Sequence, residues 1–547
     1  MRKELTMKIL IGGAWPYANG SLHIGHIAGL LPGDVLARYH RAIGNQVYYV
    51  SGSDCHGTPV SIRAAQEGSS PEEVSGRYHQ EFCRCFDALG FSYDKYGKTS
   101  APEHTRFASD FHAKLYQSPL VYEQTEQQAY CPSCRRFLAD RFLTGTCPAC
   151  GAPARGDQCD ACGTVLDSAS LSEPVCALCG GKPEWQESRH LYLAASRLEP
   201  QLRALLENSR GWRKNAQAFT RRYLDEGLRD RALTRDLDWG IDVPKPGYEG
   251  KKIYIWAENV LGYLSMSAAL LEEQGEDFRS LWGEEADALH YYVHAKDNIP
   301  FHTIILPALL LAQGENLRLP DRIVSNEYLT LEGRKVSTSQ NWAIWVKDLI
   351  GRYHPDSIRY FMLANGPEKR DADFTWAEFV RCHNSDLVGV YGNFIHRTLA
   401  FVEKYRGSLV PDSAWEPWLE EELAALYTQV GSAIAEGKLR EALGLILEQA
   451  KAANRFFDTC RPWALREGDP AGCSRCLFLC VQLIANLANL FAPFLPFSSA
   501  QVLFRFGLSP SWALCKVPGG LRLPPAALLF ERLDRDTAER ERERLGV

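Results

Sequence analysis

Four cysteine pairs of the form Cys-X-X-Cys lie within residues 131 to 179. Two thiolates on one tight turn supply half of a tetrahedral zinc site, and two such turns complete it at Zn–S distances of about 2.3 Å. Because all eight cysteines obey one spacing, the sequence predicts two structural zinc ions with no coordination position left open. A short segment with so little apolar sequence folds only when its metal binds. The predicted ligands are Cys131, Cys134, Cys147, Cys150, Cys159, Cys162, Cys176 and Cys179.

The way in which the four pairs combine is left open by their spacing. The two inner pairs lie closest together, separated by "GAPARGDQ", which favours an inner site and an outer site made by the first and last pairs. The alternative joins the first pair to the second and the third to the fourth. A further pair, Cys473 and Cys476, has no partner pair nearby and begins an apolar stretch, so we interpret it as structural.

The composition of the chain limits its location and its partners. A length of 547 residues exceeds what one core organises, so we expect about three structural units. A formal net charge of −6 excludes a generally basic nucleic-acid binder but leaves room for a local basic face. Seventeen cysteines, behind an N-terminus without the long apolar core of a signal peptide, predict a cytoplasmic protein whose thiols bind metal or stay buried.

One apolar stretch, "CLFLCVQLIANLANLFAPFLPF" from Cys476, is long enough to span a membrane. It carries Gln482, Asn486, Asn489 and two prolines, and these interruptions favour a buried helix of a bundle. We therefore expect no membrane partner.

The order of the apolar segments predicts an α/β fold. "KILIGG" and "QVYYVSGSD" are typical of short buried strands, and "HIGHIAGLLPGDVLARYHRAIG" between them has helical spacing with Pro32 inside it. This order implies a parallel sheet, and a helix from Pro71 to Leu89 continues the alternation. Beyond the cysteine region, "KIYIWAENV", "LGYLSMSAALLEEQG", "ALHYYVHAKD" and "IPFHTIILPALLLAQG" resume it, so an insertion splits the sheet. From about Phe379 the apolar spacing predicts an all-α bundle.

Two polar motifs accompany this pattern. "HIGH", residues 23 to 26, falls at the start of the first sheet helix, where backbone N–H groups and the helix dipole favour phosphate. His23 and His26 can donate hydrogen bonds to a phosphoryl group as charge builds in a transition state. A second element, "LEGRKVSTS", places Lys335, Ser337 and Ser339 in a polar loop that, taken alone, is typical of a solvated turn.

Together, "HIGH" and "KVSTS" resemble the HIGH and KMSKS signatures of class I aminoacyl-tRNA synthetases. Seven ordered segments resemble the methionyl-tRNA synthetase family over essentially the whole chain: "GGAWPYANGSLHIGH", "SGSDCHGTP", "DRFLTGTCPACG", "YIWAENVLGY", "AKDNIPFH", "NEYLTLEGRKVSTS" and "NRFFDTCRPW". The resemblance implies a methionine–tRNA ligase. The carboxylate of L-methionine attacks the α-phosphorus of ATP, Mg²⁺-bound pyrophosphate leaves, and the terminal ribose hydroxyl of tRNA(Met) attacks the adenylate, for translation initiation and elongation.

The resemblance also implies roles for individual residues. His23 and His26 stabilise the phosphoryl transition state, and Lys335 closes with its loop over the triphosphate. The residues implied to bind ATP are His23, His26, Lys335, Ser337, Thr338 and Ser339. Asp54 holds the methionine ammonium, and the thioether pocket consists of Ala14, Trp15, Tyr17, Trp256, Tyr263 and His302. The residues implied to read the anticodon, inferred as CAU, are Asn393, Arg397 and Trp463.

The family pattern divides the chain into five segments. Residues 1–117 and 241–325 are expected to be the two halves of a Rossmann-like catalytic domain, and 118–240 a connective insertion with two zinc knuckles. Residues 326–378 hold the signature loop and contact the tRNA stem, and 379–547 form the helical anticodon-binding domain. Since the chain ends after this bundle, without the domain through which many relatives dimerise, we expect a monomer.

Two departures from the family pattern leave questions open. Val336 and Thr338 stand where the signature has Met and its second Lys, so one positive charge near the phosphates is absent, and Lys335 or Arg334 are candidates to replace it. Trp15 stands where Leu is common, which shapes the methionine pocket differently. The alternative function is that of a paralogue that binds RNA without catalysis, and methionine-dependent pyrophosphate exchange separates the two.

Overall fold

The computed structural model describes residues 6–156, 159, 161–162, 166, 170–338 and 340–546. At its centre is a five-stranded parallel sheet with the strand order β14-β13-β1-β2-β3. Its strands are β1 (Lys8–Gly13), β2 (Gln46–Ser53), β3 (Lys95–Lys98), β13 (Ala288–Ala295) and β14 (Arg322–Asn326). Three of these strands precede the cysteine region and two follow it, which confirms the predicted parallel sheet split by an insertion.

Helices cover both faces of this sheet. They are α1 (Ile24–Ala42), α2 (Thr58–Glu67), α3 (Pro71–Ala88), α4 (Pro102–Leu115), α8 (Gly262–Gln274), α9 (Arg279–Trp282) and α10 (Leu306–Gln313). Ile9 and Ile11 of β1 pack in one apolar core with α1 and α3, while Leu10 packs in another with α4, α8 and α10. Successive residues of a strand point to opposite faces, so one short strand joins two cores. As predicted, α1 contains Pro32.

The expectation that "KIYIWAENV" continues the alternation as a sheet strand is wrong. Lys252–Ile253 (β12) pairs antiparallel with Thr234–Arg235 (β11) in a separate two-stranded sheet, and Ile255–Glu258 is a helical turn, α7. The reason is a tertiary contact, because this turn directs Glu258 inward onto the buried His56. A short apolar run does not by itself distinguish a strand from a buried helix.

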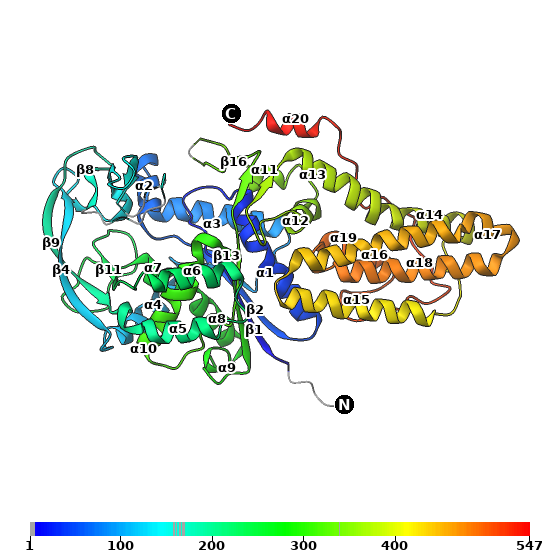
Figure 1. Cartoon of the computed structure of the whole chain (residues 1–547), viewed down its shortest axis with the longest axis horizontal. Helices are drawn as coiled ribbons and strands as arrows, with labels where there is room; N and C mark the ends of the chain where they lie inside the picture. Colours follow the sequence, from blue (N-terminus) through cyan, green and yellow to red (C-terminus); the bar gives the residue numbers. More distant parts are fainter. Residues whose placement is uncertain are drawn as a thin grey trace.

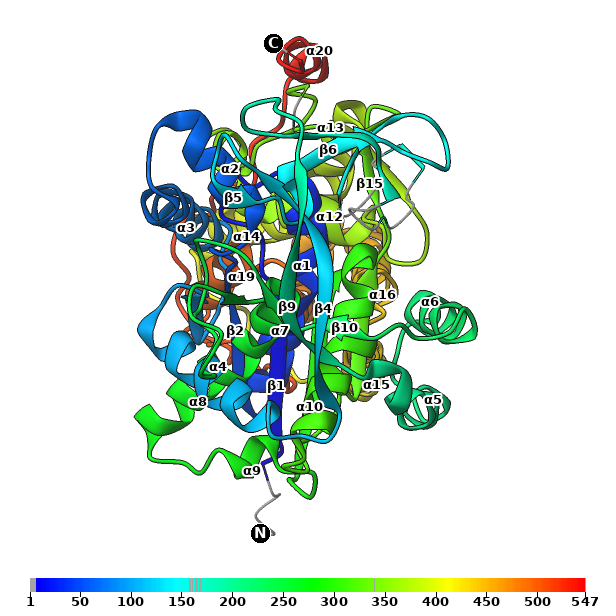
Figure 2. The ribbon, with the colours of Figure 1, turned by 90° about the vertical axis from the view of Figure 1, so that its left-hand side faces the viewer.

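The insertion is a long antiparallel ribbon that carries the cysteine region. Its strands, β4 (Val121–Cys131) and β9 (Glu184–Leu193), lie on the side of the molecule opposite the helical bundle in Figure 1 and in front of the sheet in Figure 2. The small elements of the cysteine region are β5 (Arg136–Phe137), η1 (Asp140–Phe142), β6 (Leu143–Thr146), β7 (Pro153–Arg155) and β8 (Ser172–Cys176). The chain returns to the main sheet through α5 (Glu199–Glu207), α6 (Lys214–Asp225) and β10 (Arg231–Ala232).

After β14, a small three-stranded sheet and three helices lead into the bundle. These elements are β15 (Leu329–Leu331), β16 (Arg334–Lys335), β17 (Ala372–Phe374), α11 (Val346–Leu349), α12 (Pro355–Ala364) and α13 (Trp376–Cys382). The bundle that extends away from the sheet in Figure 1 confirms the predicted all-α region. Its helices are α14 (Asn393–Arg406), α15 (Pro417–Ala435), α16 (Leu439–Cys460), α17 (Pro462–Gly468), α18 (Pro470–Phe491) and α19 (Pro496–Arg505), and a last helix, α20 (Thr537–Arg542), contacts α13.

α18 contains the apolar stretch predicted as a bundle helix. Among the described residues it is the one helix long and apolar enough to cross a membrane, and 78% of its most apolar window is buried in the molecule. Gln482, Asn486 and Asn489 donate hydrogen bonds of 2.8–3.0 Å to backbone carbonyls of the segment 513–517. The polar side chains that interrupt the stretch are therefore satisfied inside the bundle, which confirms that interpretation.

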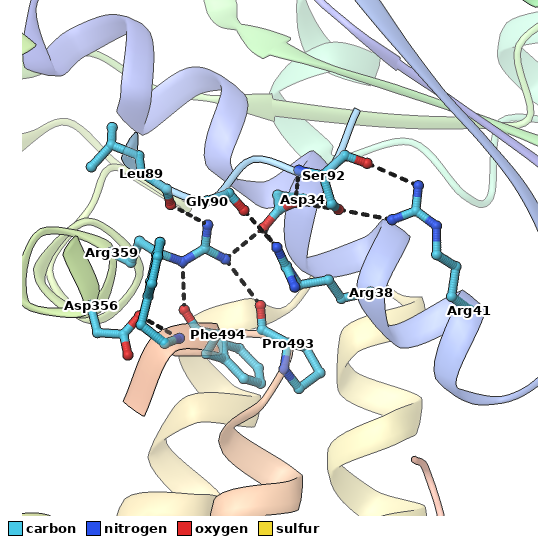
Figure 3. A network of polar contacts seen from close by, with 11 residues as sticks. Asp34, Arg38, Arg41, Leu89, Gly90, Ser92, Asp356, Arg359, Pro493 and Phe494 are labelled. Atoms are coloured by element: carbon cyan, nitrogen blue, oxygen red, sulfur yellow. Dashed lines mark hydrogen bonds and ion pairs between the residues drawn. The ribbon is translucent and has the colours of Figure 1, made fainter. Parts of the chain in front are cut away.

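A buried polar joint ties α1 to the bundle (Figure 3). Arg359 of α12 donates to the carboxylate of Asp34, in the middle of α1, at 2.6 Å. Its guanidinium also donates to backbone carbonyls of Leu89 and of Pro493–Phe494. Burial alone raises the pKa of Asp34, but the charges of Arg359 and Arg38 outweigh it and hold the pKa below its ordinary value. Breaking a buried ion pair would leave an uncompensated buried charge, which is strongly destabilising. This joint therefore fixes α1 relative to the bundle.

Candidate active site

The histidine signature forms the N-terminal cap of α1, which follows β1. Nδ1 of His23 accepts a hydrogen bond from the backbone N–H of Gly25 at 3.1 Å. Nδ1 of His26 accepts one from the backbone N–H of His23, also at 3.1 Å. Two histidines thus make the reciprocal capping box that Ser or Thr usually makes with Glu. A side chain at Gly25 would meet the His23 ring at 2.8 Å, so the packing of the cap requires glycine there.

This cap fixes which nitrogen of each imidazole carries the proton. A neutral imidazole has one donor and one acceptor nitrogen, and since both Nδ1 atoms accept, both Nε2 atoms are donors. Burial, and then the neighbouring His26, lower the pKa of His23 well below 6.5, while burial lowers the pKa of His26 to about 4. With ring centroids 3.9 Å apart, the pair offers two neutral N–H donors side by side.

The second signature faces the first across one cavity. The chain that follows the β15–β16 hairpin returns to α1, where the N–H of Ile24 donates to the carbonyl of Ile344 at 3.0 Å and that of Val346 to the carbonyl of Leu22 at 2.8 Å. The cavity has a volume of about 1070 Å³, enough for a nucleotide. Among the residues that line it are His23, His26, Lys335, Ser337 and Thr338. Ser339, the remaining predicted ATP-binding residue, lies outside the described residues.

Asp54 follows β2 and is fully buried. Its Oδ2 accepts a hydrogen bond from the side-chain amide of Asn259 at 3.0 Å. Burial, and then the charge of Glu258, raise the pKa of Asp54 to about 8. Glu258 itself stays ionised, because His56 and His104 outweigh its burial and bring its pKa to about 2. The Oδ1 of Asn259 is buried without a hydrogen-bond partner among the described residues, so this corner holds the carboxyl group of Asp54 beside an unused amide oxygen.

Trp15 fills a slot between β2 and α8. A side chain at Gly52 would meet the Trp15 ring at 2.3 Å and one at Gly262 would meet it at 2.4 Å, so the two glycines make room for the indole. Tyr263 packs edge-on against Trp15, with ring centroids 6.4 Å apart, and its hydroxyl forms a 2.8 Å hydrogen bond with Nε2 of His302. Burial lowers the pKa of His302 to about 4, so this aromatic group is uncharged at neutral pH.

The structure places the predicted methionine-binding residues in three different settings. The wall of the large cavity includes Ala14 and Trp15. The buried members, which are not among its lining residues, are Asp54, Tyr263 and His302. Trp256 borders a separate small apolar cavity, and Tyr17 is 36% exposed. Their predicted roles in methionine binding stay predictions.

The eight predicted metal ligands form two groups of four, within each of which all sulfur atoms lie within 4.8 Å of one another. The outer group is Cys131, Cys134, Cys176 and Cys179, and the inner group is Cys147, Cys150, Cys159 and Cys162. Sulfur–sulfur distances of 3.5 and 3.8 Å in the outer group and 3.8 and 3.7 Å in the inner group match the spacing of about 3.8 Å that tetrahedral zinc requires. The preferred inner and outer pairing is confirmed and the alternative is excluded. Cys473 and Cys476 belong to neither group and are buried in α18.

Comparison with known proteins identifies the family. A family model described as "tRNA synthetases class I (M)" matches residues 9–399. A "Methionine--tRNA ligase" of Bacillus cereus (strain 03BB102) is 50% identical over 544 residues, 98% of this chain and 99% of that relative. The chain belongs to the methionyl-tRNA synthetase family.

Further comparisons within the methionyl-tRNA synthetases agree in sequence and in fold. The "Methionine--tRNA ligase 1" of Alkaliphilus oremlandii (strain OhILAs) is 49% identical over 542 residues, 99% of this chain and all of that relative. A solved Mycobacterium tuberculosis methionyl-tRNA synthetase in complex with methionyl-adenylate superposes with a TM-score of 0.79 at 23% identity, over 96% of this chain and 100% of that chain. At that identity the superposition shows the shared fold.

The three residues that the synthetase family's pattern assigns to the anticodon lie together in the bundle. Arg397, one turn after Asn393 in α14, donates to the carboxylate of Asp458 at 2.8 Å, and its guanidinium lies over the ring of Phe457 at 4.3 Å. Trp463 of α17 is 51% exposed, with its ring 6.0 Å from that of Phe457. α17 lies at the end of the bundle remote from the cysteine region (Figure 1). An exposed indole beside hydrogen-bonding side chains suits the stacking of an unpaired base.

Sequence reasoning missed three contributors to this synthetase's cavity region. Glu258 carried a usable signal, since a carboxylate inside the apolar "YIWAENV" is costly to bury unless it is paired, and His56 is its partner. Asn259 had no signal before its contact with Asp54 was known. Arg155, from the cysteine region, lines the large cavity, and nothing in its local sequence indicates that placement.

Proposed function

We propose that the chain activates L-methionine with ATP and transfers it to tRNA(Met), as a methionine–tRNA ligase. The observation that carries the proposal is the convergence of both signatures on one cavity beside a buried carboxylate. His23, His26 and Lys335 line that cavity. Asp54 adjoins it, because its N–H donates to the carbonyl of Pro16, a residue of the cavity wall, at 2.9 Å.

In the first step the methionine carboxylate attacks the α-phosphorus of ATP, and the bond to pyrophosphate breaks. Negative charge builds on the phosphoryl oxygens, where the Nε2–H groups of His23 and His26 donate hydrogen bonds. Their lowered pKa values keep both rings neutral, so they act without gaining a proton. Lys335 brings a positive charge to the triphosphate from an exposed hairpin, and Mg²⁺ arrives with ATP. Catalysis therefore depends on positioning and charge stabilisation.

The buried corner at Asp54 is suited to the ammonium group of methionine. The carboxylate of Asp54 supplies the countercharge, and the unused Oδ1 of Asn259 accepts one of the ammonium hydrogens. Trp15 supplies an aromatic, uncharged surface for the thioether, which a polarizable sulfur favours. The predicted contacts of Tyr17, Trp256, Tyr263 and His302 with the side chain belong to this proposal. Such a pocket separates close analogues only modestly, so homocysteine needs a further means of rejection.

Zinc is the proposed ion of the two four-cysteine groups, because four thiolates at these spacings satisfy a tetrahedral ion and leave no position for water or substrate. When bound, it supplies folding energy to the cysteine region. The proposal also includes a monomeric cytoplasmic protein, with the domain limits given by the family pattern.

The deciding measurement is ATP–pyrophosphate exchange with each of the twenty amino acids, on protein with a measured zinc content. Exchange with methionine alone is expected, since the reverse of the activation step regenerates ATP from labelled pyrophosphate. Exchange with no amino acid would overturn the proposal and favour the RNA-binding alternative.

Trp463→Ala tests the second substrate. If this indole stacks on an anticodon base, kcat/KM for tRNA(Met) falls about 10- to 100-fold in aminoacylation, because one stacked base contributes about 1–3 kcal/mol. Pyrophosphate exchange without tRNA is expected to be unchanged. Trp418→Ala is the control, since Trp418 is also an exposed tryptophan of the bundle, at 45% exposure. Equal losses in both variants would contradict anticodon reading by Trp463.

A further inference from the structure

The large cavity receives positive charge from two separate parts of the chain. Arg334 and Lys335 reach it from the β15–β16 hairpin, as the sequence predicts, and Arg155 reaches it from β7 of the cysteine region. These are the three Lys or Arg residues among the described residues that line it. A triphosphate carries several negative charges into this space, so each of these cations bears on how ATP is held.

Acidic residues in the same wall add negative charge, so more positive charge is needed there to hold a triphosphate. The lining includes the carboxylates of Asp297, Glu327 and Asp371. Lys296 neutralises two of them, with ion pairs of 2.8 Å to Glu327 and 2.7 Å to Asp371. Thr338, at the place of the second signature lysine, adds no charge. The guanidinium of Arg334 lies 4.1 Å from the ring centroid of Trp342, which holds it against the hairpin.

The backbone around Arg155 is held firmly within the cysteine region. β7 pairs with β6, and Arg155 stands opposite Thr144. The N–H of Gly156 donates to the carbonyl of Leu143 at 2.9 Å, and that of Cys147 to the carbonyl of Ala152 at 2.8 Å. β7 also lies between Cys150 and Cys159, two ligands of the inner group, so a bound ion would close the loop that carries it.

The direction of the Arg155 side chain follows from the strand. Its neighbour Ala154 is 5% exposed and packs in the apolar core of the cysteine region. Because successive side chains of a strand point to opposite faces, Arg155 points out of that core. On that outer face Arg155 lies in the wall of the large cavity, and two contacts tie the insertion to the rest of the molecule. Ile62 of α2 packs against the same core, and the indole N–H of Trp239 donates to the carbonyl of Cys55 at 2.7 Å.

We propose that Arg155 binds the triphosphate of ATP and supplies, from the cysteine region, the positive charge that Thr338 does not supply in the signature loop. This proposal rests on the proposed function, which makes ATP the substrate. A guanidinium is well suited to the role, because it donates paired hydrogen bonds to phosphate oxygens and is always charged. The cysteine region then has a direct part in activation, and its metal content governs how ATP binds.

The test compares Arg155→Gln with Lys182→Gln in ATP–pyrophosphate exchange without tRNA. Lys182 is a cation of the same region that does not line the cavity, so the two variants lose the same charge. Arg155→Gln is expected to lower kcat/KM for ATP about 10- to 100-fold, the size of one charge-assisted hydrogen bond. KM for methionine is expected to stay within about threefold, and Lys182→Gln to resemble the unchanged chain.

The compensation itself is tested by adding Thr338→Lys. A lysine in the signature loop is expected to recover at least about fivefold of the loss caused by Arg155→Gln. Zinc content is measured in every variant. Arg155→Lys, which keeps the charge, serves as the control that separates loss of charge from misfolding. It is expected to retain more activity than Arg155→Gln.

Several results would overturn the proposal. A loss smaller than about fivefold in Arg155→Gln, or no recovery with Thr338→Lys, would remove Arg155 from the ATP site. A drop in zinc content in both Arg155 variants would assign the residue to folding of the cysteine region. Unchanged exchange with slower aminoacylation would assign it to the phosphates of tRNA. If the unaltered chain shows no methionine-dependent exchange, the proposed function itself is contradicted, and this result can be told apart from the failure of the Arg155 proposal.

Discussion

Two parts of the site hold their polar groups differently. The floor is made by the residues that follow β1 and, just behind the cavity wall, by those that follow β2. The rim is made by the hairpins β6–β7 and β15–β16. On the floor, His23 and His26 are fixed by hydrogen bonds to backbone, and Asp54 by one to Asn259. On the rim, Lys335 and Arg155 are exposed side chains. The floor groups are buried or held by the backbone before any substrate arrives, whereas the rim groups lie at the water-exposed surface.

The floor and the rim are therefore expected to determine different kinetic quantities. Groups fixed in advance need no reorganisation when charge develops, so they act on the chemical step. Exposed cations are screened by water and salt, and they act chiefly on the capture and orientation of a charged substrate. Losses on the floor are therefore expected to exceed losses on the rim.

The largest effect is expected from Asp54→Asn, which removes the carboxylate that the buried corner offers to an ammonium group. The kcat/KM for methionine should fall about 100- to 4000-fold, because a lone buried charge costs about 3–5 kcal/mol. Exchange kinetics measure this, and KM for ATP should move by less than about threefold. Asp110→Asn, on the exposed face of α4, is the matched control. A loss that appears in the KM for ATP instead would place Asp54 outside the methionine site.

The next effect concerns the histidine cap. His26→Ala should slow adenylate formation about 100-fold or more, the loss usual for one transition-state hydrogen bond, with little change in methionine affinity. His26→Asn separates the two duties of the ring, because an amide oxygen can still accept from the backbone N–H of His23 but offers no Nε2–H. Single-turnover rates and equilibrium methionine binding give the two quantities. If asparagine restores the rate, the cap matters and the proton donor does not.

A smaller effect follows from the pKa of Asp54, about 8 in the empty site. Below that pH the carboxyl group is protonated and does not attract an ammonium ion. The apparent affinity for methionine should therefore rise with pH, by up to about tenfold per pH unit between about pH 6 and 8, and then level off. Titrations of methionine binding without ATP measure this slope. Asp54→Asn should abolish it, and a flat profile in the unaltered chain would mean that Asp54 is already ionised.

Much of the fold could be read from local sequence, because its signals are local. The helix over Pro71–Ala88 has Pro71 at its first turn and a Ser70 and Glu73 capping box, all visible in four letters. The eight metal ligands followed from spacing alone, whereas spacing favoured their nested pairing and the structure settled it. The segment Ile255–Glu258 could not be predicted in this way, since its helical turn depends on the ion pair of Glu258 with His56, about two hundred positions earlier in the chain.

The candidate site likewise combines features that local sequence predicts with features that depend on tertiary contacts. "HIGH" and "KVSTS" are contiguous strings whose chemistry can be recognised before folding, and the structure brings both to one cavity. The Nε2–H tautomer of the histidines, by contrast, is set by how the backbone turns at Gly25.

Local sequence was enough to predict the parallel sheet with its insertion, the helical bundle, the eight metal ligands and the two signature motifs, because each is encoded by periodicity or spacing within a short window. Three other features depend on the folded arrangement: Asn259 meets Asp54, Trp15 fits between Gly52 and Gly262, and Arg155 lines the cavity of the signature loop. These contacts join residues far apart in the chain, and their energies come from burial and charge in a shared space, which no local pattern records.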